Sequence, residues 1–116
     1  MQDFKNLRVW QMAHQLAINA YELSEYLREP KAWALRDQIL KAVISIPSNI
    51  AEGAGEYSSN EKGRFYRMAK RSATECAGIF DVCFRLKLIE EEQHRKGRDL
   101  LLRIVSMLTK MAKVNN

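Results

Sequence analysis

The stretch from Ser58 to Leu86, SSNEKGRFYRMAKRSATECAGIFDVCFRL, carries the clearest structural pattern in the chain. Ser58 followed by Glu61 has the spacing of a capping box, in which the serine side chain binds a free backbone N–H at the start of a helix. Apolar and small residues then recur at alternating intervals of four and three, at Phe65, Ala69, Ser72, Cys76, Ile79, Cys83 and Leu86. This period, close to 3.6 residues, predicts one long amphipathic helix.

Three further stretches show the same period. The first runs from Leu7 to Leu27 through Trp10, Ala13, Ala17, Ala20 and Ser24. The second contains Leu35, Ile39, Ala42, Val43, Ile46 and Ile50, and the last contains Leu101, Ile104, Val105, Leu108 and Met111. Because the residue before a proline avoids the helical region, Pro30 predicts that the first helix ends near Arg28 or Glu29 and the second begins around Ala32. Left-handed caps at Gly53 and Gly55 are expected to end the second helix.

Four helices joined by short connections predict an all-α fold, an up-down-up-down antiparallel four-helix bundle. Pro47 lies inside the second helix, where it removes a backbone donor and presses on the carbonyl of Val43, so a kink at Pro47 is expected. Two shorter helices broken at Ser45 are the alternative. With 116 residues, the chain is expected to form a single domain over residues 1–116.

Composition leaves the function open. Nineteen Lys and Arg against fourteen Asp and Glu give a net charge of +5, which permits a polyanionic partner without requiring one. No apolar run approaches eighteen residues and the first residues lack the pattern of a signal peptide, which predicts a cytoplasmic protein with no membrane partner. Cys76 and Cys83 lie about 10.5 Å apart along the predicted helix, too far for a disulfide.

The segment from Ser45 to Gly53, SIPSNIAEG, followed by Ser58, Glu61, Arg64 and Phe65, resembles the four-helix-bundle proteins encoded in 23S ribosomal RNA intervening sequences. The likeness continues into the opening residues and the third helix. It implies a ring-like homopentamer without established enzymatic activity, whose distant relatives are accessory proteins of diversity-generating retroelements that engage nucleic acid and a reverse transcriptase. The chain departs from the family pattern at Ala73 and Thr74, and at Arg85 to Lys87, where a glycine is usual.

A basic segment is the candidate nucleic-acid site. Arg64, Arg67 and Arg71 are spaced i, i+3 and i+7, which places three guanidinium groups on one helix face. With Lys70 they form the predicted nucleic-acid-binding residues, because guanidinium forks suit phosphates. The alternative is a solvated basic face without a partner. Trp10, Trp33, Tyr57 and Phe84 are candidate base-stacking platforms, but aromatic residues at helical spacing are more often core or subunit contacts. Trp33 and Phe84 are the favoured interface residues among them.

Asn49, Glu52 and Glu75 are polar residues next to the apolar stripes of the second and third helices. Together with Pro47 they are predicted to be a structural motif, whose hydrogen bonds satisfy carbonyl groups freed by the proline and fix the register of the bundle. The alternative is a pocket or an oligomer contact. The sequence does not decide between the two.

An enzyme is the least favoured function. A di-iron bundle needs two Glu-x-x-His pairs, and only Glu91 with His94 has that spacing, since His14 is preceded by Gln11. No metal, cofactor or catalytic residue is therefore expected. The favoured function is a non-enzymatic, oligomeric RNA-associated protein, with RNA or another nucleic acid as partner. The alternative is a scaffold that binds a protein.

Overall fold

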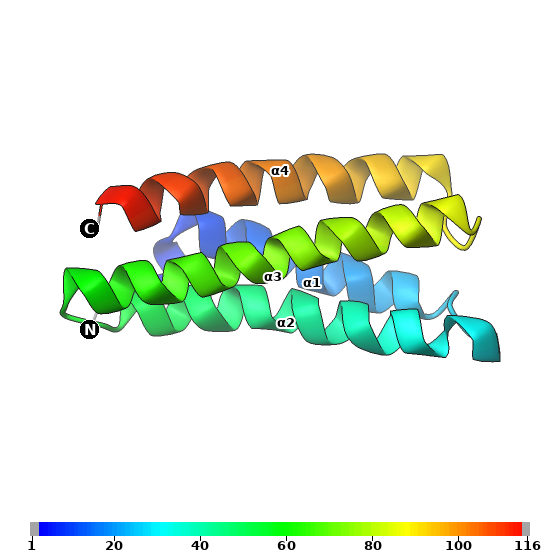
Figure 1. The fold of residues 1–116 in the computed structure, drawn as a ribbon, viewed down its shortest axis with the longest axis horizontal. Helices are drawn as coiled ribbons and strands as arrows, with labels where there is room; N and C mark the ends of the chain where they lie inside the picture. The colour runs from blue at the N-terminus through cyan, green and yellow to red at the C-terminus, as the bar shows by residue number, and fades with distance from the viewer. Residues whose placement is uncertain (1–2, 115–116) are drawn as a thin grey trace.

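The structure, a computed structural model, describes residues 3–114 and consists of four long helices (Figure 1). A short 3-10 helix, η1 (Phe4–Asn6), precedes α1 (Arg8–Ser24), and a second one, η2 (Pro30–Ala32), precedes α2 (Trp33–Ala54). The other two long helices are α3 (Ser59–Arg85) and α4 (Glu91–Val114). α1 packs beside α2 and α4, α2 beside α3, and α3 beside α4. The predicted up-down-up-down bundle is confirmed as a rod of 44 × 20 × 19 Å.

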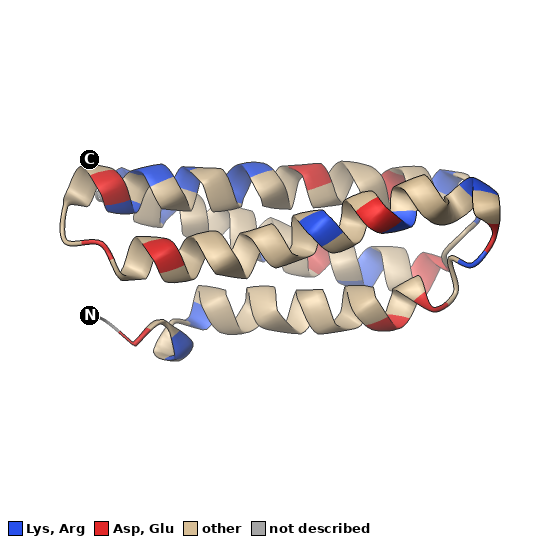
Figure 2. Ribbon diagram, turned by 90° about the horizontal axis from the view of Figure 1, so that it is seen from below, with Lys and Arg blue, Asp and Glu red and all other residues tan. Residues whose placement is uncertain are grey.

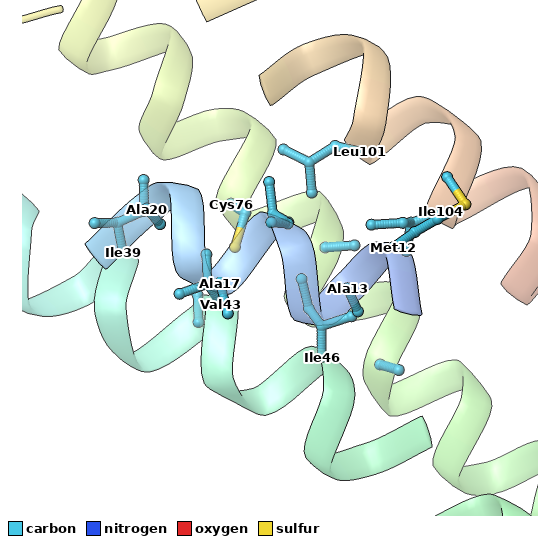
Figure 3. Close-up of a cluster of buried hydrophobic side chains, with 14 of the residues drawn as sticks. Met12, Ala13, Ala17, Ala20, Ile39, Val43, Ile46, Cys76, Leu101 and Ile104 are labelled. Atoms are coloured by element: carbon cyan, nitrogen blue, oxygen red, sulfur yellow. The ribbon is translucent and has the colours of Figure 1, made fainter. Parts of the chain in front are cut away.

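The core lies along the axis of the rod and is built from the predicted stripes. α1 contributes small residues, and Figure 3 shows Ala13, Ala17 and Ala20 facing Ile46, Val43 and Ile39 of α2. The short alanine side chains of α1 leave room for these larger apolar side chains of α2. From the other side, Leu101 and Ile104 of α4 complete the apolar interior.

The buried face of α3 includes residues that the sequence prediction left out of the apolar stripe. Tyr66, Ala73 and Phe80 are buried beside Ala69 and Cys76, whereas Leu86 is 58% exposed. The departure at Ala73 from the family pattern therefore puts a small residue, with no exposed surface, at a close contact between helices. The prediction that Leu86 belongs to the core is wrong, because α3 ends at Arg85 and the chain turns away there.

α2 continues through Pro47 as a single helix, so the alternative of two helices broken at Ser45 is wrong. Side chains next to the proline bind carbonyl groups one turn back. Ser48 Oγ donates to the carbonyl of Ile44 at 2.8 Å, and Asn49 Nδ2 donates to that of Ser45 at 2.8 Å. Both carbonyls belong to residues after Val43, whose own carbonyl faces the proline ring and receives neither bond. A serine bond to the carbonyl four residues back favours a bend. How far the helix bends at Pro47 stays a prediction.

The ends of the helices differ from the sequence expectations. α1 ends at Ser24, a few residues before Arg28. At the end of α2, Gly55 has a φ of −81°, and none of the glycines within residues 3–114 has a positive φ, so the predicted left-handed caps are wrong. Lys62 Nζ instead donates to the last carbonyls of α2, those of Gly53 at 3.2 Å and Ala54 at 3.1 Å.

The two ends of α3 are capped by recognisable motifs. Ser58 Oγ accepts a hydrogen bond from the backbone N–H of Glu61 at 3.3 Å, the serine half of the predicted capping box. At the other end, Lys87 has a φ of 60°, and the N–H groups of Lys87 and Leu88 donate to the carbonyls of Phe84 and Cys83. This pair of bonds is a Schellman motif with lysine at the position where glycine is usual. Among residues 3–114, no helix is long and apolar enough to cross a bilayer.

Candidate nucleic-acid interface

Three predicted contact residues, Arg64, Arg67 and Arg71, lie exposed on the outer face of α3. Their spacing of three and four residues on one straight helix brings their guanidinium groups into a single row, as the sequence predicts. Arg64 has a carboxylate partner and an aromatic neighbour on α3. It pairs with Glu61 at 3.0 Å and lies 4.6 Å from the centroid of the Phe65 ring. The hydrogen bond and charge of Glu61 raise the pKa of Arg64.

The lysines of the same segment differ from these arginines. Lys70, the fourth predicted contact residue, is half-buried, so its stem covers the bundle while its ammonium group reaches outward. Lys62 is tied to the end of α2 by the two hydrogen bonds described above. The segment therefore offers fewer unengaged cations than its sequence suggests, because Lys62 caps a helix and Arg64 has a carboxylate partner.

The net charge of the chain is concentrated toward one end of the rod. This basic end holds the start of α1, the α2–α3 connection and the end of α4 (Figure 1). Its basic residues are Lys5, Arg8, Lys62, Arg64, Arg67, Lys70, Arg71, Lys110 and Lys113. Its acidic residues are Asp3, Glu52, Glu56 and Glu61. Nine bases against four acids account for the whole excess of +5, so the charges elsewhere in the molecule balance.

A second surface, on α1 and α2, has no charge. Residues 9–21 of α1 and residues 42–51 of α2 contain no Asp, Glu, Lys or Arg. Figure 2 shows the two stretches side by side, both uncharged along this face. Apolar side chains are exposed here, with Ile18 at 40%, Tyr21 at 47% and Ile44 at 44%. We call this the uncharged α1–α2 face, and an apolar surface of this kind is typical of protein contacts.

Asn49 takes part in a hydrogen-bond chain that links α2 to α3. Its Nδ2 lies 3.1 Å from Ser45 Oγ, which in turn lies 2.8 Å from Ser72 Oγ. Ser45, the first residue of the SIPSNIAEG segment, is therefore the link between Asn49 and α3. Glu52 and Glu75 are exposed and lie outside this chain of bonds. Asn49 donates to the carbonyl of Ser45, whereas the carbonyl that Pro47 frees is that of Val43. The structural role of Asn49, Glu52 and Glu75 stays a prediction.

Gly53 completes the α2–α3 contact at the basic end. A Cβ atom added there would lie 2.7 Å from the ring of Tyr66 and 3.2 Å from Cβ of Phe65. Only glycine leaves room for the buried Tyr66 ring at this crossing. The last residue of the SIPSNIAEG segment therefore has a steric role.

The aromatic candidates occupy different environments. Tyr57, in the α2–α3 connection, is 95% exposed, and Trp33 is 53% exposed with its Nε1 donating to the carbonyl of Arg28 at 3.0 Å. Trp10 and Phe84 are half-buried and stack on histidines, Trp10 on His14 and Phe84 on His94. Of these rings, Tyr57 has the most open surface for stacking.

The two cysteines considered as nucleophiles are packed in the core, and His94, considered as a metal ligand, lies beside Asp81. Burial raises the pKa of the Cys76 thiol to about 12 and also raises that of Cys83. His94 Nε2 lies 3.7 Å from Asp81 Oδ1, and Glu91 is exposed on the first turn of α4. Within residues 3–114, no group of three or more His, Cys, Asp or Glu side chains could hold a metal ion.

Two hollows flank α4. One, of about 460 Å³, lies between α1 and α4 over Leu16 and Leu23, and the other, of about 470 Å³, lies between α3 and α4 over Leu101 and Val105. The Phe80 ring lines both. Neither contains the basic residues of α3 discussed above.

The chain matches the family described as 23S rRNA-intervening sequence protein over residues 5–110. A solved structure with the same fold is the crystal structure, at 1.70 Å resolution, of a protein of unknown function from the S23 ribosomal protein family of Bacteroides thetaiotaomicron. The two chains share 24% sequence identity with a TM-score of 0.85, over 90% of this chain and 98% of the other. No curated protein matches the chain. Because the family match spans nearly all of the sequence, the chain belongs to the 23S rRNA-intervening sequence protein family.

Proposed function

We propose that this protein is a non-enzymatic, oligomeric RNA-associated protein that contacts nucleic acid through Arg64, Arg67, Lys70 and Arg71. The observation that carries the proposal is the exposed arginine row of α3, within a stretch, residues 62–74, that contains no acidic residue. Guanidinium groups bind phosphate through two parallel hydrogen bonds. A row of such groups on a rigid helix is suited to a sugar-phosphate backbone and carries little information about base sequence.

The uncharged α1–α2 face supports the oligomeric part of the proposal. Its exposed apolar side chains, Ile18, Tyr21 and Ile44, gain stability when a second copy covers them, because apolar surface is removed from water. A homopentamer is the assembly implied by the resemblance described above. In a ring, each copy repeats the arginine row, so one RNA strand meets several rows at once.

The absence of catalysis is part of the proposal and is supported by the state of the thiols. A cysteine must be a thiolate to act as a nucleophile, and burial disfavours the thiolate of both Cys76 and Cys83. Their small, apolar side chains instead fill the space between helices.

A scaffold that binds a protein is the second candidate function. The same uncharged α1–α2 face favours it, since this face suits a protein partner as well as another copy. The distant resemblance to retroelement accessory proteins makes a reverse transcriptase one such partner. The two functions differ in whether the arginine row is needed.

The proposal is tested by replacing Arg64, Arg67 and Arg71 with glutamine together. Arginine and glutamine have similar helix propensities, so the fold should persist and can be checked by circular dichroism. If each subunit neutralises about three phosphates of a single strand, log affinity should fall with log salt at a slope of roughly −2 per engaged subunit, and the triple variant should flatten that slope. Equal RNA binding by the variant and the parent at matched salt would overturn the RNA proposal and leave the scaffold as the leading function.

A further inference from the structure

The end of α4 lies beside the arginine row and carries cations of its own. Thr74 of α3 and Val105 of α4 line one hollow, and Asp81 meets His94 nearer the other end, which fixes the antiparallel register of the two helices. Each helix rises about 1.5 Å per residue. Lys110 and Lys113 therefore lie level with Arg67 and Arg64 to within about one helical turn.

This part of the α3–α4 pair contains no carboxylate except at the start of α3. Residues 62–74 of α3 and residues 100–114 of α4 contain no Asp or Glu. Their basic residues are Lys62, Arg64, Arg67, Lys70, Arg71, Arg103, Lys110 and Lys113. Such a one-signed surface attracts a polyanion. The first half of α4 differs because it carries carboxylates among its cations, and Arg95 pairs with Glu92 at 2.8 Å and with Asp99 at 3.4 Å.

Tyr57 stands at the tip of the same end, just before the N-cap of α3. Its side chain is 95% exposed, more than Tyr26 at 75% and Trp33 at 53%, so both faces of the ring are open to a base. Arg67 lies about 12 Å along the axis of α3 from Ser59, the residue two positions after Tyr57. A ring next to a row of cations is the arrangement with which proteins hold single strands, because a base stacks on the ring while the cations follow the phosphates.

We infer that the basic end of the bundle is a binding site for single-stranded RNA, in which one base stacks on Tyr57 and Lys110 and Lys113 join the arginine row along the phosphates. This inference rests on the proposed function and adds to it the form of the nucleic acid and three further residues. A duplex offers no free base face to Tyr57 except at its ends, so the site prefers single strands.

The test measures binding by fluorescence anisotropy, with a labelled uridine dodecamer and with an abasic ribose-phosphate dodecamer of equal charge. Tyr57→Leu should weaken uridine binding about tenfold, a typical effect of losing one stacked base, and should leave abasic binding unchanged. Tyr57→Phe keeps the ring and should bind like the parent. Replacing Lys110 and Lys113 by glutamine should weaken both ligands and lower the salt slope by about 1.4 per subunit.

A matched control removes two cations from the opposite end of the rod, in the double variant Arg28→Gln, Lys31→Gln. It has the same change in charge and should bind like the parent. If the parent and the Arg64, Arg67, Arg71 variant bind alike, the proposed function itself fails. If the arginine variant is weakened while Tyr57→Leu and the Lys110, Lys113 variant bind normally, only the present inference is overturned. Equal affinity for the uridine and abasic strands, or for a polyglutamate of the same charge, would also overturn it.

Discussion

Lys87 is the residue whose backbone is least suited to its side chain. Its φ of 60° lies in the left-handed region, where the Cβ of an L-residue crowds the following carbonyl oxygen. The Schellman bonds from Lys87 and Leu88 hold the conformation, and Leu88 packs against the core. Lysine is tolerated there because these contacts together outweigh the local strain.

Replacing Lys87 by glycine should relieve this strain. Lys87→Ala removes the same charge and keeps the Cβ atom, so it serves as the matched control. We expect the glycine variant to have a free energy of unfolding about 1 kcal/mol higher than the alanine variant, measured by urea denaturation. Equal stability of the two variants would show that the positive φ costs nothing at this position.

Replacing each of two helical glycines by alanine should change the free energy of unfolding in opposite directions. Gly53→Ala places a methyl group 2.7 Å from the Tyr66 ring and should lower the free energy of unfolding by about 1–3 kcal/mol, as overpacking does. Gly78→Ala meets nothing within 4 Å and should raise it by about 0.5–1 kcal/mol, because alanine favours the helix. Thermal unfolding of the two variants gives the comparison. A stabilising Gly53→Ala would mean that the two helices can separate at little cost.

At the scale of the elements, α2 combines a helix-breaking residue with the bonds that keep it helical. Pro47→Ala restores the missing N–H, yet Ser48 and Asn49 already hold the neighbouring carbonyls. We expect the variant to straighten α2 and to disturb assembly, because the predicted bend at Pro47 would shape the uncharged α1–α2 face. Light scattering reports the assembly and urea denaturation the stability. An unchanged oligomer with higher stability would show that the proline has no architectural role.

The four helices and the starts of α2 and α3 could be predicted from sequence, whereas the C-terminal ends of α1, α2 and α3 could not. The periodic stripes of α1 to α4 depend on burial alone, which the spacing of apolar residues reports directly. The end of α2 depends on Lys62, nine residues after Gly53, and the end of α3 on a left-handed lysine. Neither contact is encoded in a local pattern. The arginine row lies on one helix, so its spacing in the sequence predicts it. Lys110 and Lys113 lie on another helix, and only the antiparallel register of α3 and α4 shows that they are neighbours of the row.

At the scale of the whole molecule, the uncharged α1–α2 face predicts how assembly can be broken. Ile44→Lys places a charge at its centre and should reduce a mass near five times 13.5 kDa to that of a monomer, because a buried unpaired charge is costly. Leu102→Lys, at another exposed apolar position, on α4, is the control and should keep the parent mass. Multi-angle light scattering at micromolar concentration gives both masses. A parent that is monomeric there would contradict the ring.

The concentration of all the excess charge at one end of a 44 Å rod gives the molecule a permanent electric dipole along its length. In the field of a polyanion the rod feels a torque that turns this end forward before any contact forms. Productive collisions are then more frequent than random orientation allows, and ionic strength should act mainly on the association rate constant. In a closed ring the copies share one axis, so the components of their dipoles along that axis add and its two sides differ in potential.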